Sequence, residues 1–149
     1  QKDKFDKYTD TLLYLAARNE HLINKIIPAL KQKKIVICDR FLDSTYAYQV
    51  IGKRVEKKFI DFIHKKILRN IKPNISFILK VNRKSSNKRL KKRKTMNRYD
   101  KFSSNFYTKT QKAFLNIAKN KKNYFVLNSS KNTTAVEKEI FNIIKKRLK

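Results

Sequence analysis

Apolar residues recur at three- and four-residue steps through most of the chain, which predicts a series of amphipathic helices. The longest pattern runs from about Phe5 to Leu30 and contains Pro28 near its end, so we expect a helix that kinks there. A second long pattern covers Val55 to Ile71. Shorter patterns predict helices at 44–50, 104–119 and from 133 or 134 onward, with Ser44, Ser103 and Thr133 or Thr134 as N-caps.

Three short runs of β-branched and aromatic residues lie between these helices and predict strands. Ile35–Cys38 is uniformly apolar, as in a strand that is buried on both faces, and Ile75–Val81 and Tyr124–Leu127 are the other two. Helices that alternate with strands are typical of an α/β fold, in which helices flank a parallel sheet. The length of 149 residues, without a clear linker, predicts a single domain over residues 1–149.

The stretch from Asn82 to Lys101 differs from the rest because it is rich in lysine and arginine and lacks the apolar residues that a core helix needs. Three interpretations are open: a solvated basic helix, a nucleic-acid-binding patch, or a lid over nucleotide phosphates. Arginines in a lid neutralise the charge of a transferring phosphoryl group, and closure of the lid expels water.

The whole chain is strongly basic, with 39 lysines and arginines against 11 acidic residues and a formal net charge of +28. Such an excess suggests a polyanionic partner, such as nucleic acid, an acidic membrane surface or nucleotide phosphates. The basic residues are nevertheless spread over the full length, as a general bias toward lysine at solvated positions would produce. We therefore expect no nucleic-acid partner and keep a basic nucleic-acid-binding module as the alternative from another function class.

Cysteine content and hydropathy bear on the cellular location. Cys38 is the only cysteine, so no internal disulfide can form, and a reducing compartment is expected. No apolar run approaches the roughly 20 residues that cross a bilayer, and the opening Gln1-Lys-Asp-Lys does not resemble a signal peptide. The sequence thus predicts a cytoplasmic protein without a membrane partner.

Two charged residues, Asp39 and Arg40, directly follow the first predicted strand. Ligands of open parallel sheets bind just beyond the carboxyl ends of the strands. The planar donor fork of an arginine suits phosphate oxygens, which it can bind bidentately. The pair therefore predicts a phosphate site, with a structural salt bridge as the alternative.

A second candidate pair lies on the first predicted helix. Tyr14 and Arg18 are four residues apart and share a face, so together they could stack on and hydrogen-bond a flat base. The alternative is a core tyrosine beside a surface arginine. His64, on the helix predicted for residues 55–71, is expected at the surface without a catalytic role.

The string D-R-F-L-D-S-T-Y-A-Y-Q, from Asp39 to Gln49, is far more specific than the Asp-Arg pair, and it resembles the substrate-binding signature of thymidylate kinases. The resemblance implies a P-loop kinase fold of the nucleoside monophosphate kinase type and a homodimer. It also implies transfer of the γ-phosphoryl group of ATP to dTMP with Mg²⁺, which forms dTDP for dTTP biosynthesis. A related deoxynucleoside kinase, which also uses an Asp-Arg pair, is the alternative in the same class.

The resemblance also implies roles for individual residues at the dTMP site. Tyr14 would stack on thymine, Arg18 would bond the thymine O4, and Arg40 would hold the phosphate of dTMP. The remaining predicted contacts are Ser44 and Thr45 near the base, Tyr48 against the deoxyribose, and Gln49 at the border of the pocket. The glycine-rich turn that follows in the family is reduced here to Val50-Ile51-Gly52.

The spacing K-R-x-x-x-R-x-x-x-x-R in the basic stretch resembles the lid of those thymidylate kinases that carry their catalytic arginine there. On that resemblance, residues 82–101 form the lid, Arg93 stabilises the transferring phosphoryl group, and Arg89 and Arg98 support it at the ATP side. Asp39 would order Arg40 and the hydration shell of Mg²⁺ through water, without binding the metal directly. Asp39, Arg40 and Arg93 are therefore the predicted catalytic residues.

The glycine content bears on the ATP site. Gly52 is the only glycine, whereas a P-loop of the form G-x-x-x-x-G-K-[ST] needs two, and the chain opens with Gln1. We therefore expect a fragment of a thymidylate kinase, incomplete at the N-terminus and lacking the P-loop region, which would be inactive alone.

Overall fold

The computed structural model describes residues 5–92, 95, 103–130 and 132–147. It divides the chain into two compact units, Gln1–Lys72 and Pro73–Lys149. The first unit is helical, and the second holds a parallel sheet between helices, which agrees with the predicted α/β class. No helix among the described residues combines the length and the apolar character that a membrane span requires.

The first unit opens with the long helix that the sequence predicts. It consists of α1 (Lys7–His21), the π-helical turn η1 (Leu22–Ile26) and α2 (Ile27–Lys31). Proline lacks a backbone N–H, and its ring collides with the carbonyl group four residues earlier in a regular helix. The wider turn before Pro28 relieves that collision, as π-bulges do at kinks.

Two further helical segments complete this unit: α3 (Leu42–Thr45), which continues into the π-helical η2 (Tyr46–Gly52), and α4 (Lys57–Ile67). The predicted cap at Ser44 is wrong, because the helix already begins at Leu42 and Ser44 lies inside it. Helix α4 ends four residues earlier than predicted, since the backbone of Arg69 and Asn70 turns to φ of 49° and 63°, a common conformation just past a helix.

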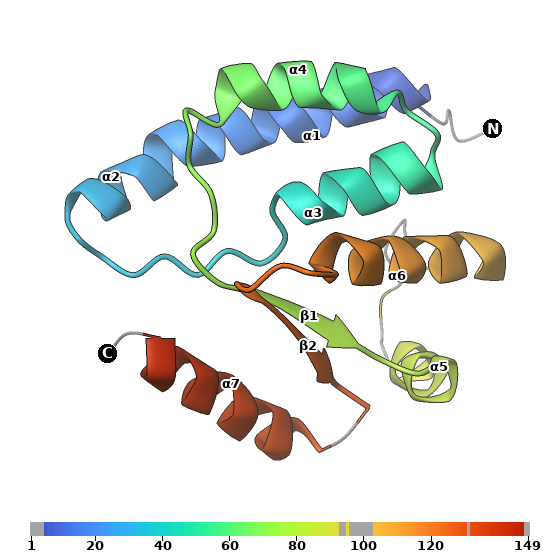
Figure 1. Cartoon of the computed structure of the whole chain (residues 1–149). Coiled ribbons are helices and arrows are strands. Elements are labelled where there is room, and N and C mark those ends of the chain that lie inside the picture. Colours follow the sequence, from blue (N-terminus) through green and yellow to red (C-terminus); the bar gives the residue numbers. More distant parts are fainter. Residues whose placement is uncertain (1–4, 93–94, 96–102, 131, 148–149) are drawn as a thin grey trace. The chain divides into compact units, whose positions relative to one another are not determined.

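The core of the first unit lies where α1, η2 and α4 meet. Leu15, Val55 and Ile60 are buried together, and partly buried aromatic and aliphatic side chains surround them. The rings of Tyr8 and Phe59 pack edge to face across this junction, with centroids 5.5 Å apart. Helix α4 therefore lies beside α1, as Figure 1 also shows.

The predicted strand at Ile35–Cys38 is wrong. This segment has no regular secondary structure, and the side chains of Ile35 and Ile37 are 77% and 92% exposed. A strand forms only where a neighbour takes up its backbone hydrogen bonds. Within the part of the chain that the structure describes, no strand pairs with this segment.

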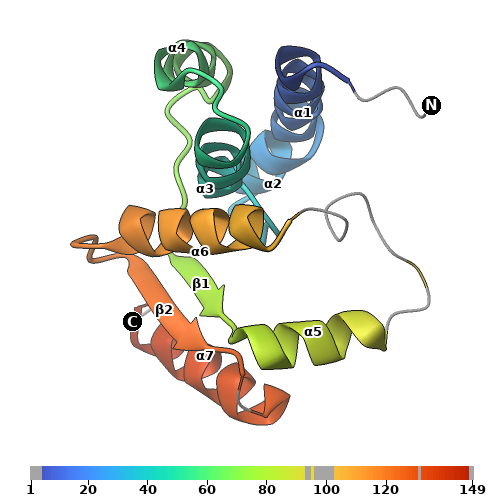
Figure 2. The same ribbon diagram turned by 90° about the vertical axis from the view of Figure 1, so that its right-hand side faces the viewer.

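The second unit contains the other two predicted strands. Strand β1 (Ser76–Lys80) pairs in parallel with β2 (Tyr124–Asn128), with Ser76 opposite Tyr124. The chain passes between them through α5 (Arg83–Lys91) and α6 (Ser104–Ala118) and ends with α7 (Thr133–Arg147). Helices α6 and α7 lie on opposite sides of the sheet (Figures 1 and 2).

Side-chain caps fix the ends of these helices. The Ser103 hydroxyl accepts a hydrogen bond from the backbone N–H of Phe106, which confirms the predicted cap of α6. At α7 the cap is Asn132, whose side-chain oxygen accepts from the N–H of Thr134, so the expected Thr133 or Thr134 cap is displaced by one or two residues. Asparagine caps as well as threonine does, so the earlier start is equally stable.

Candidate active site

Arg18, in the last turn of α1, is held by three neutral oxygen or nitrogen acceptors. Its Nη1 donates to the Thr45 hydroxyl at 2.6 Å and to His64 Nε2 at 3.2 Å, and its Nη2 donates to the Phe41 carbonyl at 3.0 Å. None of the described carboxylates forms an ion pair with it. Burial lowers the pKa of the Arg18 guanidinium, but arginine stays protonated at neutral pH, so this cation is fixed in orientation and keeps its charge.

His64, on α4, is a buried partner of Arg18, and the prediction that it lies at the surface is wrong. It is 3% exposed, and its ring packs edge-on against Tyr46, with centroids 5.5 Å apart. Burial, followed by the nearby Arg18 charge, lowers the pKa of His64 to about 4. The sequence contains the signal for this burial, since His64 continues the apolar face of Ile60, Ile63 and Ile67.

The lowered pKa of His64 predicts acid-sensitive stability. A histidine that is neutral in the folded state takes up protons preferentially when the chain unfolds, so its contribution is complete above its ordinary pKa of 6.5 and is lost as the pH falls toward 4. We expect the free energy of unfolding to fall by about 2 kcal/mol between about pH 7 and about pH 4.5. Urea unfolding at both pH values checks this, and H64Q, which cannot titrate, should lack this loss.

Arg40 adopts a backbone conformation that is unusual for a residue with a side chain. Its φ is 70°, in the left-handed region, and its side chain is exposed, with the guanidinium carbon 5.2 Å from the centre of the Tyr48 ring. Strained backbone of this kind is concentrated at functional sites. Residues of the same short segment, Phe41 and Thr45, bind Arg18, so Arg18 and the Arg40 segment form one structural assembly.

The other predicted contacts to dTMP are spread over the same unit. Tyr14 is 40% exposed on α1, and Ser44 and Tyr48 are half-buried on α3 and η2. Thr45 and Gln49 are 1% and 3% exposed, and the Thr45 hydroxyl accepts a hydrogen bond from Arg18. The geometry therefore brings Arg18 together with Thr45, and Arg40 together with Tyr48.

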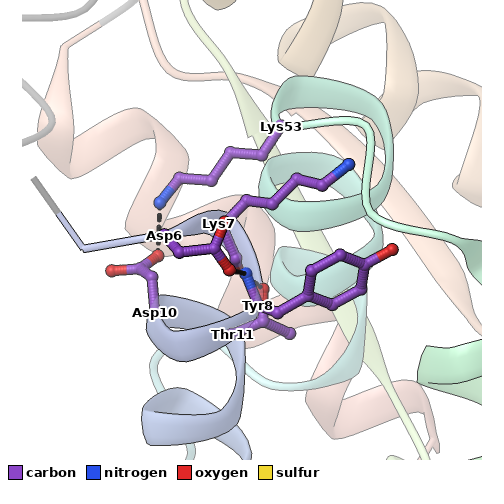
Figure 3. A network of polar contacts seen from close by, with 6 residues as sticks. All are labelled: Asp6, Lys7, Tyr8, Asp10, Thr11 and Lys53. Carbon is purple, nitrogen blue, oxygen red and sulfur yellow. Dashed lines mark hydrogen bonds and ion pairs between the residues drawn. The ribbon is translucent and has the colours of Figure 1, made fainter.

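A buried ion pair ties α1 to the end of η2. Figure 3 shows the Lys53 ammonium reaching Asp10, and the two side chains are only 13% and 2% exposed. Nearby, the Asp6 carboxylate caps α1 at the N–H of Tyr8, and Lys7 donates to the Arg54 carbonyl. This network anchors the C-terminal end of η2, the helix that carries Tyr48 and Gln49. The sequence alone does not predict the contact between Asp10 and Lys53, which are 43 positions apart.

Asp39 is exposed at the start of the same segment. One carboxylate fits the predicted role toward Mg²⁺, because this ion keeps most of its water and is commonly held by one or two carboxylates together with substrate phosphates. The neighbouring Cys38 thiol lies 3.5 Å from the Arg40 carbonyl, and burial raises its pKa. The described part of the chain contains no cluster of three or more metal-ligating side chains.

The predicted lid belongs to the second unit. Asn82 caps α5 through the N–H of Ser85, and Arg89 donates to the Ser129 carbonyl at 2.5 Å. Arg89 also lines a mainly aliphatic cavity of about 470 Å³ beside α7, whose lining residues all belong to the second unit. Arg93 and Arg98 lie outside the described residues, so their roles stay predictions.

Comparisons with known proteins agree on one family. The family sequence model described as thymidylate kinase matches residues 1–140. Thymidylate kinase from Aster yellows witches'-broom phytoplasma (strain AYWB) is 41% identical over 150 residues, which cover 98% of this chain and 70% of that protein. Thymidylate kinase from Wolbachia pipientis subsp. Culex pipiens (strain wPip) is 39% identical, covering 99% of this chain and 72% of that protein.

A solved structure gives the same result. The crystal structure of thymidylate kinase from Ehrlichia chaffeensis superposes with a TM-score of 0.73 at 28% sequence identity, covering 97% of this chain and 70% of that one.

Proposed function

Because the chain belongs to the thymidylate kinase family, we propose that its protein phosphorylates dTMP to dTDP, with ATP as the phosphoryl donor. The observation that carries this proposal is that Arg18 is hydrogen-bonded to Phe41 and Thr45, which closely follow Arg40 in the chain, while Arg40 lies against Tyr48 of the same segment. We assign Arg18 to the base end of the proposed site and Arg40 to its phosphate end. The family match favours neither the deoxynucleoside kinase nor the nucleic-acid-binding module.

Arg40 supports the phosphate end of the proposed site. Its guanidinium is exposed and lies against the ring of Tyr48, which holds the fork in place by a cation–π contact. A planar fork can donate two parallel hydrogen bonds to phosphate oxygens, which fixes both the position and the rotation of the phosphate. Tyr48 at this point would also border the sugar, where a bulky ring leaves no room for a 2′-hydroxyl.

Arg18 supports the base end. Its donors outnumber the three acceptors that Thr45, Phe41 and His64 supply, so further N–H groups stay available for the O4 carbonyl of thymine. Cytosine carries an amino group at the same position. Because this amino group and the arginine N–H groups are all donors, they could not form that hydrogen bond. Tyr14, four residues earlier on α1, is exposed and is proposed to stack on the base, with Ser44 and Gln49 at the border.

The chemical step needs charge neutralisation and in-line positioning more than covalent chemistry. Mg²⁺, when bound, would offset the negative charge of the phosphate groups. Asp39 is proposed to accept hydrogen bonds from water in the shell of that ion and to orient Arg40. Arg93 is proposed to stabilise the transferring group, with Arg89 and Arg98 as supporting cations in the lid. Homodimer formation and a cytoplasmic location stay predictions from the family resemblance.

A nucleotide panel tests the proposed function. The protein translated from the complete coding sequence is incubated with Mg·ATP and with dTMP, dUMP, dCMP or AMP, and ADP formation is followed. We expect the highest kcat/KM with dTMP. Equal rates with all four nucleotides, or no rate with dTMP, would contradict the assignment.

Substitution of Arg18 tests the base end of the site. In R18M we expect kcat/KM for dTMP to fall about 30-fold, because the base loses a hydrogen bond to a charged donor, which is worth about 2 kcal/mol. Discrimination against dCMP should weaken as well, since the clash with its amino group disappears. Steady-state kinetics with both nucleotides provide the measurement, and unchanged discrimination would argue against contact between Arg18 and the base.

A further inference from the structure

The hydrogen bond between His64 and Arg18 determines which nitrogen of the imidazole carries its proton. Its Nε2 faces an Arg18 N–H at 3.2 Å. Because Arg18 can only donate, Nε2 must carry a lone pair, and the single proton of a neutral imidazole must then lie on Nδ1. Nδ1 is buried and has no hydrogen-bond partner among the described residues. Buried polar groups without partners are rare in folded proteins, so this one calls for an explanation.

The surroundings of His64 keep the ring in one orientation. The Tyr46 ring packs edge-on against it, and the Tyr46 hydroxyl donates to Asp61 at 2.6 Å. Burial, followed by the hydrogen bond to Asp61, raises the pKa of Tyr46, so it stays a neutral donor. Among the residues that the structure describes, the charged or titratable groups that face the imidazole are Arg18 from α1, Tyr46 from η2 and Asp61 from α4 itself.

We propose that His64 is a positioning residue for nucleobase recognition: its neutral Nε2 fixes the plane of the Arg18 guanidinium, so that the remaining N–H groups of Arg18 point at the base. This inference rests on the proposed function. Thr45 and the Phe41 carbonyl bind Arg18 from the segment after Arg40, whereas His64 binds it from α4, and acceptors from two elements prevent the guanidinium from rotating. An acidic side chain in place of His64 would neutralise the charge that the base carbonyl needs, whereas a neutral ring does not.

Two substitutions at His64 separate positioning from packing. Leucine keeps an apolar volume but cannot accept a hydrogen bond, whereas the side-chain oxygen of glutamine can accept one near the position of Nε2 and does not titrate. We expect H64L to raise KM for dTMP about tenfold with kcat within about twofold, as the loss of an oriented contact to a charged group implies. H64Q should restore KM to within about threefold of the unsubstituted protein. H21L, at an exposed histidine of α1, serves as the matched control and should behave like the unsubstituted protein.

The tautomer of His64 can be determined by NMR spectroscopy in the unsubstituted protein. This measurement does not depend on whether H64L folds. We expect the ¹⁵N signal of Nε2 to show the unprotonated form from about pH 8 to about pH 5.5 and to shift when dTMP binds. A protonated Nε2 in that pH range, or a ¹⁵N signal that does not change when dTMP binds, would overturn the inference. Equal KM values for H64L and the unsubstituted protein would also overturn it, as would an equal rise in KM for H64L and H64Q. An unsubstituted protein that does not phosphorylate dTMP would instead overturn the proposed function, and the inference with it.

Discussion

Replacing Arg40 with glycine is expected to lower kcat/KM for dTMP about 1,000-fold while the protein stays folded. The proposed bidentate contact to phosphate consists of two charge-assisted hydrogen bonds, and their joint loss is worth about 4 kcal/mol. Glycine is the informative substitution because the backbone φ of Arg40 is 70°, which glycine adopts without the strain that other residues carry. Steady-state kinetics together with urea unfolding give both quantities for the same variant.

Arg54 offers a matched control for Arg40. It is also an exposed arginine with a positive φ, 57°, and its contact to Lys7 uses the backbone carbonyl, which a substitution leaves in place. R54G should therefore keep kcat/KM within about threefold of the unsubstituted protein and be at least as stable. If R54G loses as much activity as R40G, the loss reflects the net positive charge or the loop backbone, and the phosphate contact proposed for Arg40 is contradicted.

Removing one partner of the Asp10–Lys53 pair is the substitution with the largest expected effect on stability. In D10A the Lys53 ammonium stays mostly buried without its counter-charge, and a broken buried pair typically costs about 3–5 kcal/mol. We expect the free energy of unfolding, from urea titration followed by circular dichroism, to fall by that amount. The double variant D10L/K53M should recover most of the loss, because an apolar pair of similar volume leaves no charge buried.

The exposed pair Lys57–Asp61 provides the contrast. Its side chains are 66% and 40% exposed and lie four residues apart on α4, so K57A is expected to cost about 0.5 kcal/mol or less. A D10A variant that is no less stable than K57A would show that water reaches Lys53, and the buried network of Figure 3 would then not hold η2 in place.

Where structure depends on neighbours in the sequence, the residues predict it well. The cap at Ser103, the long helix through Pro28 and the strands at β1 and β2 follow from local spacing, side-chain capping and β-branched character. The early end of α4 is also local, but it depends on a left-handed backbone at Arg69 and Asn70 that no glycine signals.

Where structure depends on distant partners, the sequence predicts less. Ile35–Cys38 has the composition of a buried strand, yet a strand exists only if another one pairs with it. The prediction that His64 lies at the surface is wrong, because its spacing from Ile60 places it on the buried face of α4. The contacts of Arg18 to Thr45 and His64 join residues 27 and 46 positions apart, which periodicity does not reveal.

The family resemblance supplied what periodicity could not, namely the connection of Arg18 with the Asp39–Gln49 segment. The geometry supports that connection through the bonds from Arg18 to Thr45 and to the carbonyl of Phe41. It also adds two features that the motif does not contain: the neutral imidazole of His64, which accepts a hydrogen bond from Arg18, and the buried Asp10–Lys53 pair.

Calorimetric titration with dTMP and with thymidine, which lacks the phosphate, tests most directly whether one nucleotide is held at its two ends by these two arginines. For R40G we expect affinity for dTMP to fall at least about 100-fold and affinity for thymidine to stay within about threefold, whereas R18M should weaken both ligands by a similar factor. If R40G weakened thymidine as strongly as dTMP, or if R18M left thymidine binding intact, the two ends of the site would not be where Arg40 and Arg18 lie.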